Sequence, residues 1–347
     1  MSSHPRRLLP VLRQHSDIEY LDAVAQGVLN PPVSTGMPFW SLNPYVGCAF
    51  GCAYCYARYA HRYALERQSG GIPDTSLPAW LAFERRILVK RTAPALLRRA
   101  LERAQRGGGG AAPLLRGAPL LIGSATDPYQ PAERHFRLTR ELLAVLAEHS
   151  RLNLVIITKS PLVTRDLDLL ARVSVRSRLT VQLSLITTDR ELARRIEPRA
   201  PTPEARLRAM RRLCEAGIDV GVNCMPVLPG ITDQPQALEA LVAAVADTGV
   251  THLAACALRL QPAARTRYLP MVREHFPALV TRYDTTYRDH TQVGERYRAG
   301  LSAYMTALCT RYGLSTRRRG ASPEEPPAES GDPDHSVPGE AQLALSF

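Results

Sequence analysis

Residues 43–58 read NPYVGCAFGCAYCYAR and contain Cys48, Cys52 and Cys55 in a C-x3-C-x2-C pattern. Structural zinc sites are closed by four ligands, normally in two spaced pairs. Electron-transfer clusters of the [4Fe–4S] type likewise use four thiolates. Three thiolates leave one iron open, which suits a cluster that binds a molecule as well as passing an electron. The pattern therefore favours a three-ligand [4Fe–4S] cluster over zinc.

The composition is that of a globular protein. The chain has 347 residues, 45% of them hydrophobic, enough for one large domain with a sizeable core. No run approaches the roughly 18 apolar residues of a membrane span, and residues 1–20 lack the apolar core of a signal peptide. We therefore expect a cytoplasmic protein without membrane contact. In a reducing cytoplasm the remaining cysteines are expected to pack as small buried hydrophobes: Cys214, Cys224, Cys256 and Cys309.

The chain is basic, with a formal net charge of +12, and nearly all of its basic residues are arginines. Such a surplus is expected of a chain that binds a polyanion such as nucleic acid, and equally of a GC-rich coding bias. Lys90 and Lys159 are the two lysines. Because arginine serves wherever only charge matters, each lysine indicates a tight site that a planar guanidinium does not fit.

Strand-like runs alternate with amphipathic stretches after residue 40, which is typical of parallel βαβ units. Six strands are expected, near 42–46 and at 119–124, 153–158, 179–186, 218–225 and 251–258. Intervening helices are expected at 136–149, 162–172, 203–216 and 235–248. Six units are too few for a closed eightfold barrel. The sequence therefore predicts an α/β fold, a partial (β/α)6 TIM-like barrel with its chemistry at the carboxyl ends of the strands.

Composition also predicts the division of the chain. We expect a basic lead-in at 1–39, a barrel core at 40–262, a helical C-terminal extension at 263–315 and a disordered, acidic, proline-rich tail at 316–347. Within these, a helix is expected at 18–28, a flexible linker at 105–118 and a helix or loop around Lys90.

The cysteine motif, with aromatic Tyr54 just before its last cysteine, resembles the signature of the radical S-adenosylmethionine (SAM) superfamily. Further segments resemble the spore photoproduct lyase-like branch, often labelled DNA repair photolyases: NPYVGC (43–48), YCYAR (54–58), LVK (88–90), TDPYQPAE (126–133), ITKS (157–160) and EPRAP (197–201). The resemblance covers about residues 40–315. It implies a lyase-like enzyme that uses a [4Fe–4S] cluster to cleave SAM reductively, giving a 5′-deoxyadenosyl radical that abstracts hydrogen from a substrate.

The resemblance also implies SAM-contacting residues. Ser124, Thr126 and Asp127 match positions that meet the amino group of SAM, although Asp-Pro is also an ordinary helix N-cap pair. Lys159 and Ser184 match positions used for the carboxylate of SAM, to which an ammonium makes a charge-assisted hydrogen bond. Tyr54 is the sixth cofactor-binding candidate, and no catalytic residue is assigned.

One departure concerns the hydrogen donor. Spore photoproduct lyases carry a cysteine shortly before the Ser/Thr-Asp that follows the second strand, and use it to return hydrogen to the product radical. The corresponding residue here is Ser124, whose O–H bond is too strong for that role. Repair of the spore thymine dimer by the same route is therefore not expected, unless Cys224 or Cys256 substitutes.

Radical SAM chemistry implies an external electron donor of flavodoxin or ferredoxin type. Nucleic acid is the expected substrate class if the arginine-rich surface binds it, and a monomer is expected. The alternative in another class is a non-catalytic iron–sulfur or zinc protein that binds nucleic acid and senses redox state or iron. A sensor, however, needs no open-iron triplet coupled to a βα barrel.

Overall fold

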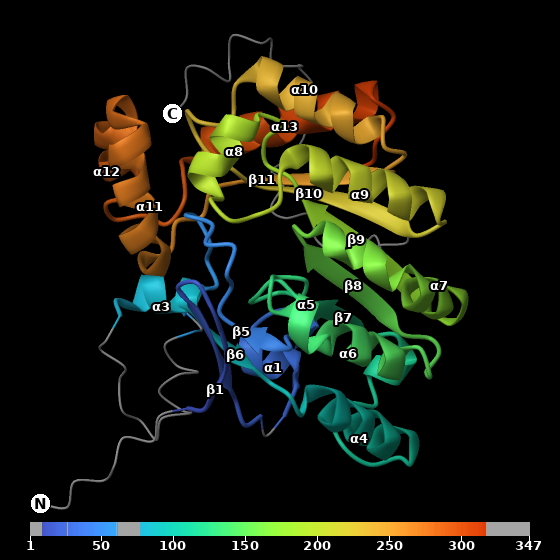
Figure 1. Cartoon of the computed structure of the whole chain (residues 1–347). Helices are drawn as coiled ribbons and strands as arrows, with labels where there is room; N and C mark the ends of the chain where they lie inside the picture. The colour runs from blue at the N-terminus through green and yellow to red at the C-terminus, as the bar shows by residue number, and fades with distance from the viewer. Residues whose placement is uncertain (1–8, 26, 60, 62–76, 317–347) are drawn as a thin grey trace, which may run out of the picture. The chain divides into compact units, whose positions relative to one another are not determined.

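The computed structural model describes residues 9–25, 27–59, 61 and 77–316 (Figure 1). The chain divides into two compact units. Unit 1 comprises Met1–Gly51 and Ala57–Val181, and unit 2 comprises Cys52–Tyr56 and Gln182–Phe347. The division therefore passes through the cysteine motif, and each unit is described by itself.

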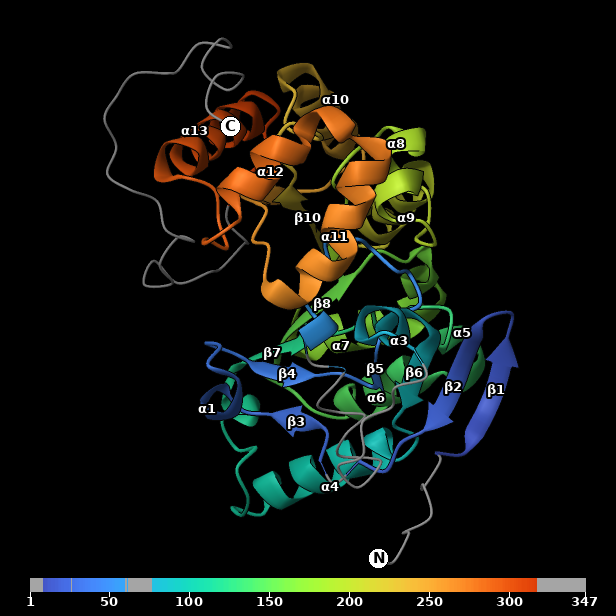
Figure 2. The same ribbon diagram turned by 90° about the vertical axis from the view of Figure 1, so that its left-hand side faces the viewer.

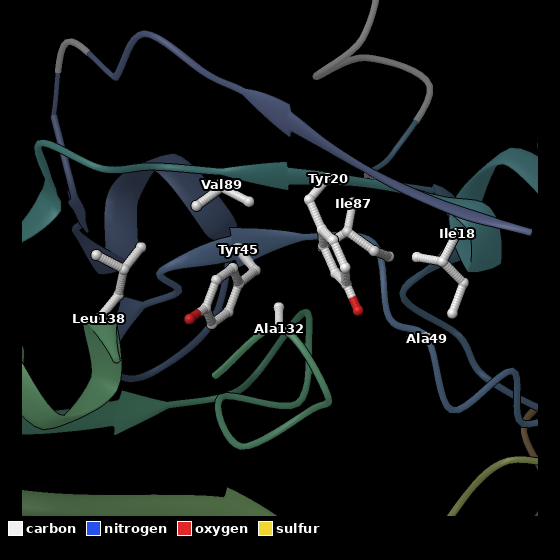
Figure 3. Close-up of a cluster of buried hydrophobic side chains, with 8 residues drawn as sticks. All are labelled: Ile18, Tyr20, Tyr45, Ala49, Ile87, Val89, Ala132 and Leu138. Atoms are coloured by element: carbon white, nitrogen blue, oxygen red, sulfur yellow. The ribbon is translucent and has the colours of Figure 1, made fainter. Parts of the chain in front are cut away.

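Unit 1 contains a four-stranded sheet in the order β1 (Val11–His15), β2 (Ile18–Asp22), β6 (Arg86–Val89), β5 (Tyr45–Val46). Strand β2 pairs antiparallel with β1 and parallel with β6, and β5 pairs antiparallel with β6. Figure 2 shows β1 and β2 lying side by side as a ribbon. Side chains from this sheet and from two nearby segments form a buried cluster (Figure 3), made of Ile18, Tyr20, Tyr45, Ala49, Ile87, Val89, Ala132 and Leu138.

This sheet corrects two predictions. The expected helix at 18–28 is wrong: Ile18 and Tyr20 alternate inward as in a strand, and β2 gains both β1 and β6 as hydrogen-bonding neighbours. The segment Arg86–Val89 is likewise strand β6, not a helix or loop, whereas Lys90 itself follows the strand in a loop. In both places pairing with a distant segment outweighs local propensity.

Unit 1 also contains strands in the order β3 (Leu29–Asn30), β4 (Trp40–Leu42), β7 (Pro119–Ile122), β8 (Asn153–Thr158), with β9 (Arg178–Ser184) running out of the unit after Val181. The β4/β7 and β7/β8 pairs are parallel, and β3 is antiparallel to β4. The strand expected near 42–46 is therefore two strands, since the chain leaves β4 at Leu42 and joins the other sheet as β5.

Along the chain, the helices of unit 1 mainly alternate with these strands. They are α1 (Pro32–Thr35), α3 (Ala79–Arg85), α4 (Ala93–Gln105), α5 (Glu133–Phe136), α6 (Leu138–Leu146) and α7 (Leu167–Arg176), with 3-10 turns at Leu114–Arg116 and Pro161–Asp166. Helices α4 and α6 pack together, and Arg98 pairs with Glu148 at 2.7 Å. Residues 105–118 connect α4 to β7 as expected, but the segment is not a featureless flexible linker, because it contains the 3-10 turn at Leu114–Arg116 and buries Ala111 and Leu114.

Besides Cys52–Tyr56, unit 2 contains the last residues of β9 and the strands β10 (Asp219–Val227) and β11 (His252–Ala257), which pair in parallel. Its helices are α8 (Arg190–Ile196), α9 (Pro203–Glu215), α10 (Pro235–Ala246), α11 (Pro262–His275), α12 (Val280–Thr286) and α13 (Glu295–Arg311), with a 3-10 turn at Pro277–Leu279. Figures 1 and 2 show α10 and α13 together, and Arg311 donates to Glu239 between them at 2.8 Å.

Local chemistry explains where these helices begin. Thr202 accepts from the Ala205 N–H and Pro203 occupies the first helical position of α9, as predicted. The predicted strands at 119–124, 153–158, 179–186, 218–225 and 251–258 are confirmed as β7 to β11 to within a few residues. The expected tail at 316–347 lies, after its first residue, outside the described residues, and the predicted domain boundaries stay a prediction.

No helix in the described part of the chain is both long and apolar enough to span a membrane.

Gly123 directly follows β7 and has a left-handed conformation with φ of 96°, and a Cβ there would lie 2.5 Å from the Ile157 carbonyl oxygen. We predict that Gly123→Ala lowers the free energy of unfolding by about 3 kcal/mol, because strain and a backbone clash add. Gly107→Ala is the matched control, since its φ is 80° but nothing lies within 4 Å, and it should cost about 1 kcal/mol. Urea unfolding followed by circular dichroism measures both. Equal losses would contradict the packing at Gly123.

Candidate functional site

The first part of the cysteine motif lies in unit 1, where its backbone is fixed on both sides of Cys48. The Cys48 N–H donates to the Phe83 carbonyl at 2.9 Å. Gly47 has φ of 87°, and a Cβ there would lie 2.8 Å from that same carbonyl oxygen, so this position requires glycine. The Gly47 carbonyl accepts from the Thr126 hydroxyl at 2.6 Å and from the Gln130 amide at 3.0 Å.

Gln130 links the residues on either side of Cys48. Its side chain is fully buried, and its carbonyl oxygen accepts from the Ala49 N–H at 3.0 Å while its amide reaches Gly47. Backbone groups that are buried must find partners, and here one side chain supplies two of them. The backbone groups of Gly47 and Ala49, on either side of Cys48, therefore have hydrogen-bond partners.

The second part of the motif lies in unit 2. The Cys55 N–H donates to the Cys52 carbonyl at 3.3 Å, and the Ala53 N–H donates to the Ile196 carbonyl at 2.9 Å. The Tyr54 hydroxyl donates to Glu197, and Glu197 forms an ion pair with Arg206. Tyr54, Glu197 and Arg206 are all buried.

Burial raises the pKa of the Tyr54 hydroxyl well above its ordinary value, and the negative charges of Glu197 and Cys52 raise it further. Burial acts to lower the pKa of Arg206, but Glu197, Tyr54 and Cys52 outweigh it, so that pKa is raised. Arg206 therefore stays cationic and neutralises Glu197, with which it is buried.

The donor set fits an iron–sulfur cluster. Cys48, Cys52 and Cys55 are thiols rather than disulfides, and thiolates are the ligands that [4Fe–4S] clusters use. Among the residues that the structure describes, no three or more His, Cys, Asp or Glu side chains already surround one point as in an assembled metal site. The fit therefore rests on the three thiols and their spacing.

The segment after β7 is held by Asn43. The side-chain amide of Asn43 donates to the Ser124 hydroxyl oxygen at 3.1 Å, and its side-chain oxygen accepts from the Ala125 N–H at 3.1 Å. The Lys90 ammonium donates to the Asn43 backbone carbonyl at 2.9 Å, and burial lowers the pKa of Lys90 to about 8. Lys90 therefore holds the backbone of Asn43, while the side chain of Asn43 holds the segment after β7.

Asp127 joins the ends of two strands. Its carboxylate accepts from the Tyr129 N–H at 2.9 Å, the Thr158 hydroxyl at 2.7 Å and the Lys159 N–H at 2.7 Å. Burial raises its pKa although these hydrogen bonds oppose the shift. Asp127 thus fixes the backbone of Lys159 at the carboxyl end of β8.

The six candidate cofactor residues divide between the units. Unit 1 brings Ser124, Thr126, Asp127 and Lys159 to the ends of β7 and β8, where barrel chemistry is expected. Unit 2 holds Tyr54 and Ser184. Arg206 connects them, because it pairs with Glu197, the partner of Tyr54, and donates to the Ser184 carbonyl at 3.0 Å. Their contacts with SAM stay predictions.

Three residues of this arrangement were not singled out from the sequence: Asn43, Gln130 and Arg206. Asn43 and Gln130 lie inside the segments that resemble the family, so position within a motif was their signal. Arg206 had none, because it is one of many arginines.

Comparison with known proteins agrees with this geometry. Residues 42–241 match the family model described as the radical SAM superfamily. An uncharacterized protein of Mycobacterium tuberculosis (strain ATCC 25618 / H37Rv) is 33% identical over 313 residues, which are 90% of this chain and 86% of the relative. An uncharacterized protein of Methanocaldococcus jannaschii is 28% identical over 219 residues, 63% of this chain and 71% of the relative.

Among solved structures, a spore photoproduct lyase complexed with dinucleoside spore photoproduct matches with a TM-score of 0.59 at 15% identity, covering 85% of this chain and 80% of that chain. A double mutant of the lyase with bound AdoMet and dinucleoside spore photoproduct matches with the same TM-score, identity and coverage. These likenesses confirm the predicted fold class, an α/β partial barrel with a helical C-terminal extension. The chain belongs to the radical SAM superfamily and has the fold of its spore photoproduct lyase-like branch.

Proposed function

We propose that this chain is an enzyme that cleaves SAM reductively at a [4Fe–4S] cluster held by Cys48, Cys52 and Cys55. The observation that carries the proposal is the set of three thiols in C-x3-C-x2-C spacing within a radical SAM chain. When bound, the cluster would supply an electron to SAM, giving methionine and a 5′-deoxyadenosyl radical.

Other residues of the chain would bind and orient SAM. Lys159, fixed through its backbone by Asp127, would direct its ammonium to the carboxylate of SAM, and Ser184 would add a hydroxyl. Ser124 and Thr126 lie on the segment that Asn43 and Gln130 hold, and would face the amino group. Preorganised donors of this kind cost little reorganisation when the ligand binds.

We further propose that the substrate is a nucleic acid and that a flavodoxin- or ferredoxin-type protein donates the electron. We propose that the enzyme is a monomer. The arginine surplus supports nucleic acid, as does the spore photoproduct lyase solved with a dinucleoside photoproduct. Ser124 supports a reaction that differs from that of the lyase in how hydrogen returns to the product radical.

The direct test is SAM cleavage by anaerobically purified protein with dithionite. Wild-type protein should contain iron and sulfide and form 5′-deoxyadenosine, and Cys52→Ala should reduce formation at least about 100-fold because a thiolate ligand is lost. Cys214→Ala, which alters a half-buried cysteine outside the motif, should leave formation within about twofold. Liquid chromatography with mass spectrometry measures the product. A cluster-replete wild type that forms none would instead support a non-catalytic sensor.

Lys159 gives a second test. Lys159→Met should weaken SAM binding about tenfold to hundredfold, because a hydrogen bond to a charged group contributes roughly 1.5–3 kcal/mol. Lys159→Arg keeps the charge but not the compact shape, so it should restore binding only partly. Equilibrium dialysis with the cluster-loaded protein measures both. Unchanged affinity in Lys159→Met would remove Lys159 from the SAM site.

A further inference from the structure

Two buried tyrosine–glutamate–arginine sets lie at the cysteine motif, one in each unit. In unit 1, Tyr45 lies three residues before Cys48, and its hydroxyl donates to Glu133 at 2.6 Å. Glu133 in turn accepts from Arg165 at 2.8 Å. In unit 2, Tyr54 lies between Cys52 and Cys55 and contacts Glu197, which pairs with Arg206. The two sets use the same three side chains for the same bonds.

The unit 1 set is tied into the surrounding fold. Glu133 also accepts from the Thr139 and Arg140 N–H groups, and Arg165 divides its donors between Glu133 and Asp166. Figure 3 shows the Tyr45 ring beside Leu138 and Ala132 in the apolar cluster. The charges acting on Tyr45 are chiefly those of Glu133 and Arg165. This set fastens strand β5 to the start of α6.

The unit 2 set is enclosed more completely. The Glu197 and Arg206 side chains are each 1% exposed. Arg206 donates to the Pro201 carbonyl at 2.9 Å and to the Ser184 carbonyl at 3.0 Å, so backbone oxygens receive the donors that do not meet Glu197. Because charges in such a place are weakly screened, they act on their neighbours over several ångströms.

The unit 2 set also acts on a cluster ligand. Besides the contact of Tyr54 with Glu197, the Ala53 N–H bonds to the Ile196 carbonyl, so two successive residues after Cys52 are fastened to residues 196 and 197. The set is therefore joined to Cys52 by closeness along the chain and by hydrogen bonds.

We propose that Tyr54, Glu197 and Arg206 are positioning residues that hold the loop at Cys52 and set the reduction potential of the cluster. This rests on the proposed function, since it requires the cluster. Net charge and hydrogen bonds around the ligand sulfurs are among the factors that set such potentials. Glu197 makes reduction harder, and Arg206 together with the Tyr54 hydroxyl offsets its charge.

The substitutions Tyr54→Phe and Glu197→Gln shift the midpoint potential of the cluster in opposite directions. Tyr54→Phe removes a donor from Glu197, leaves its negative charge less neutralised and lowers the midpoint potential. Glu197→Gln removes the negative charge while keeping the shape, leaves Arg206 uncompensated and raises the potential. A role in packing alone gives no reason for opposite shifts. Glu197→Gln should also lose stability, since it leaves a buried cation unpaired.

The experiment is an EPR-monitored redox titration of the cluster-loaded full chain, with iron content and thermal unfolding measured alongside. Glu197→Gln should ease reduction about tenfold, which is about 59 mV upward for a one-electron couple. Tyr54→Phe should shift the potential downward. The matched controls Tyr45→Phe and Glu133→Gln remove the same groups from the unit 1 set, and should lose stability with little change in potential.

Potentials unchanged in both unit 2 variants, or shifted alike in the unit 1 controls, would overturn the inference while leaving SAM cleavage by the wild type intact. If Tyr54→Phe folds but loses iron that Tyr45→Phe retains, the positioning role is supported. If Tyr54→Phe does not fold, the upward shift in Glu197→Gln decides the question. A wild type without a cluster would defeat the proposed function itself, and the inference with it.

Discussion

A loop whose cysteine sulfurs are to bind iron must find other hydrogen-bond partners for its buried backbone groups. Around Cys48 this demand is met by the Phe83 carbonyl and by Gln130, which serves the residues on both sides. Around Cys52 it is met by the Ile196 carbonyl, while the Tyr54 hydroxyl anchors its side chain to Glu197. Because these partners come from far along the chain, the placement of the strands and helices decides whether the loop can form.

The same requirement explains several polar residues that are buried at a cost. Asn43 orders the segment after β7, Asp127 ties that segment to β8, and Glu197 is neutralised by Arg206. Buried polar groups are tolerable when every member finds a partner, and such networks then fix one conformation. Here they surround the segments that the family resemblance assigns to the cluster and to SAM, which is where precise positioning is most useful for chemistry.

Much of this could be predicted from the sequence where the signal is local. The strands β7 to β11 follow from apolar runs between helical stretches, and α9 follows from Thr202 and Pro203. The metal ligands expected from cysteine spacing stay a prediction. Prediction failed where distant pairing decides. Ile18–Asp22 has an apolar pattern compatible with either element, and only its pairing with β1 and β6 makes it a strand. Arg206 differs from the other arginines in being buried beside Glu197, and the sequence does not show which of the many arginines is buried in this way.

We propose that Cys48, Cys52 and Cys55 hold a [4Fe–4S] cluster whose open iron binds SAM. EPR spectra of the anaerobically reduced protein, recorded before and after SAM is added, test this binding. An open iron predicts a reduced [4Fe–4S] signal whose g values change on addition of SAM and are unaffected by adenosine. A spectrum that is identical with and without saturating SAM would contradict the claim.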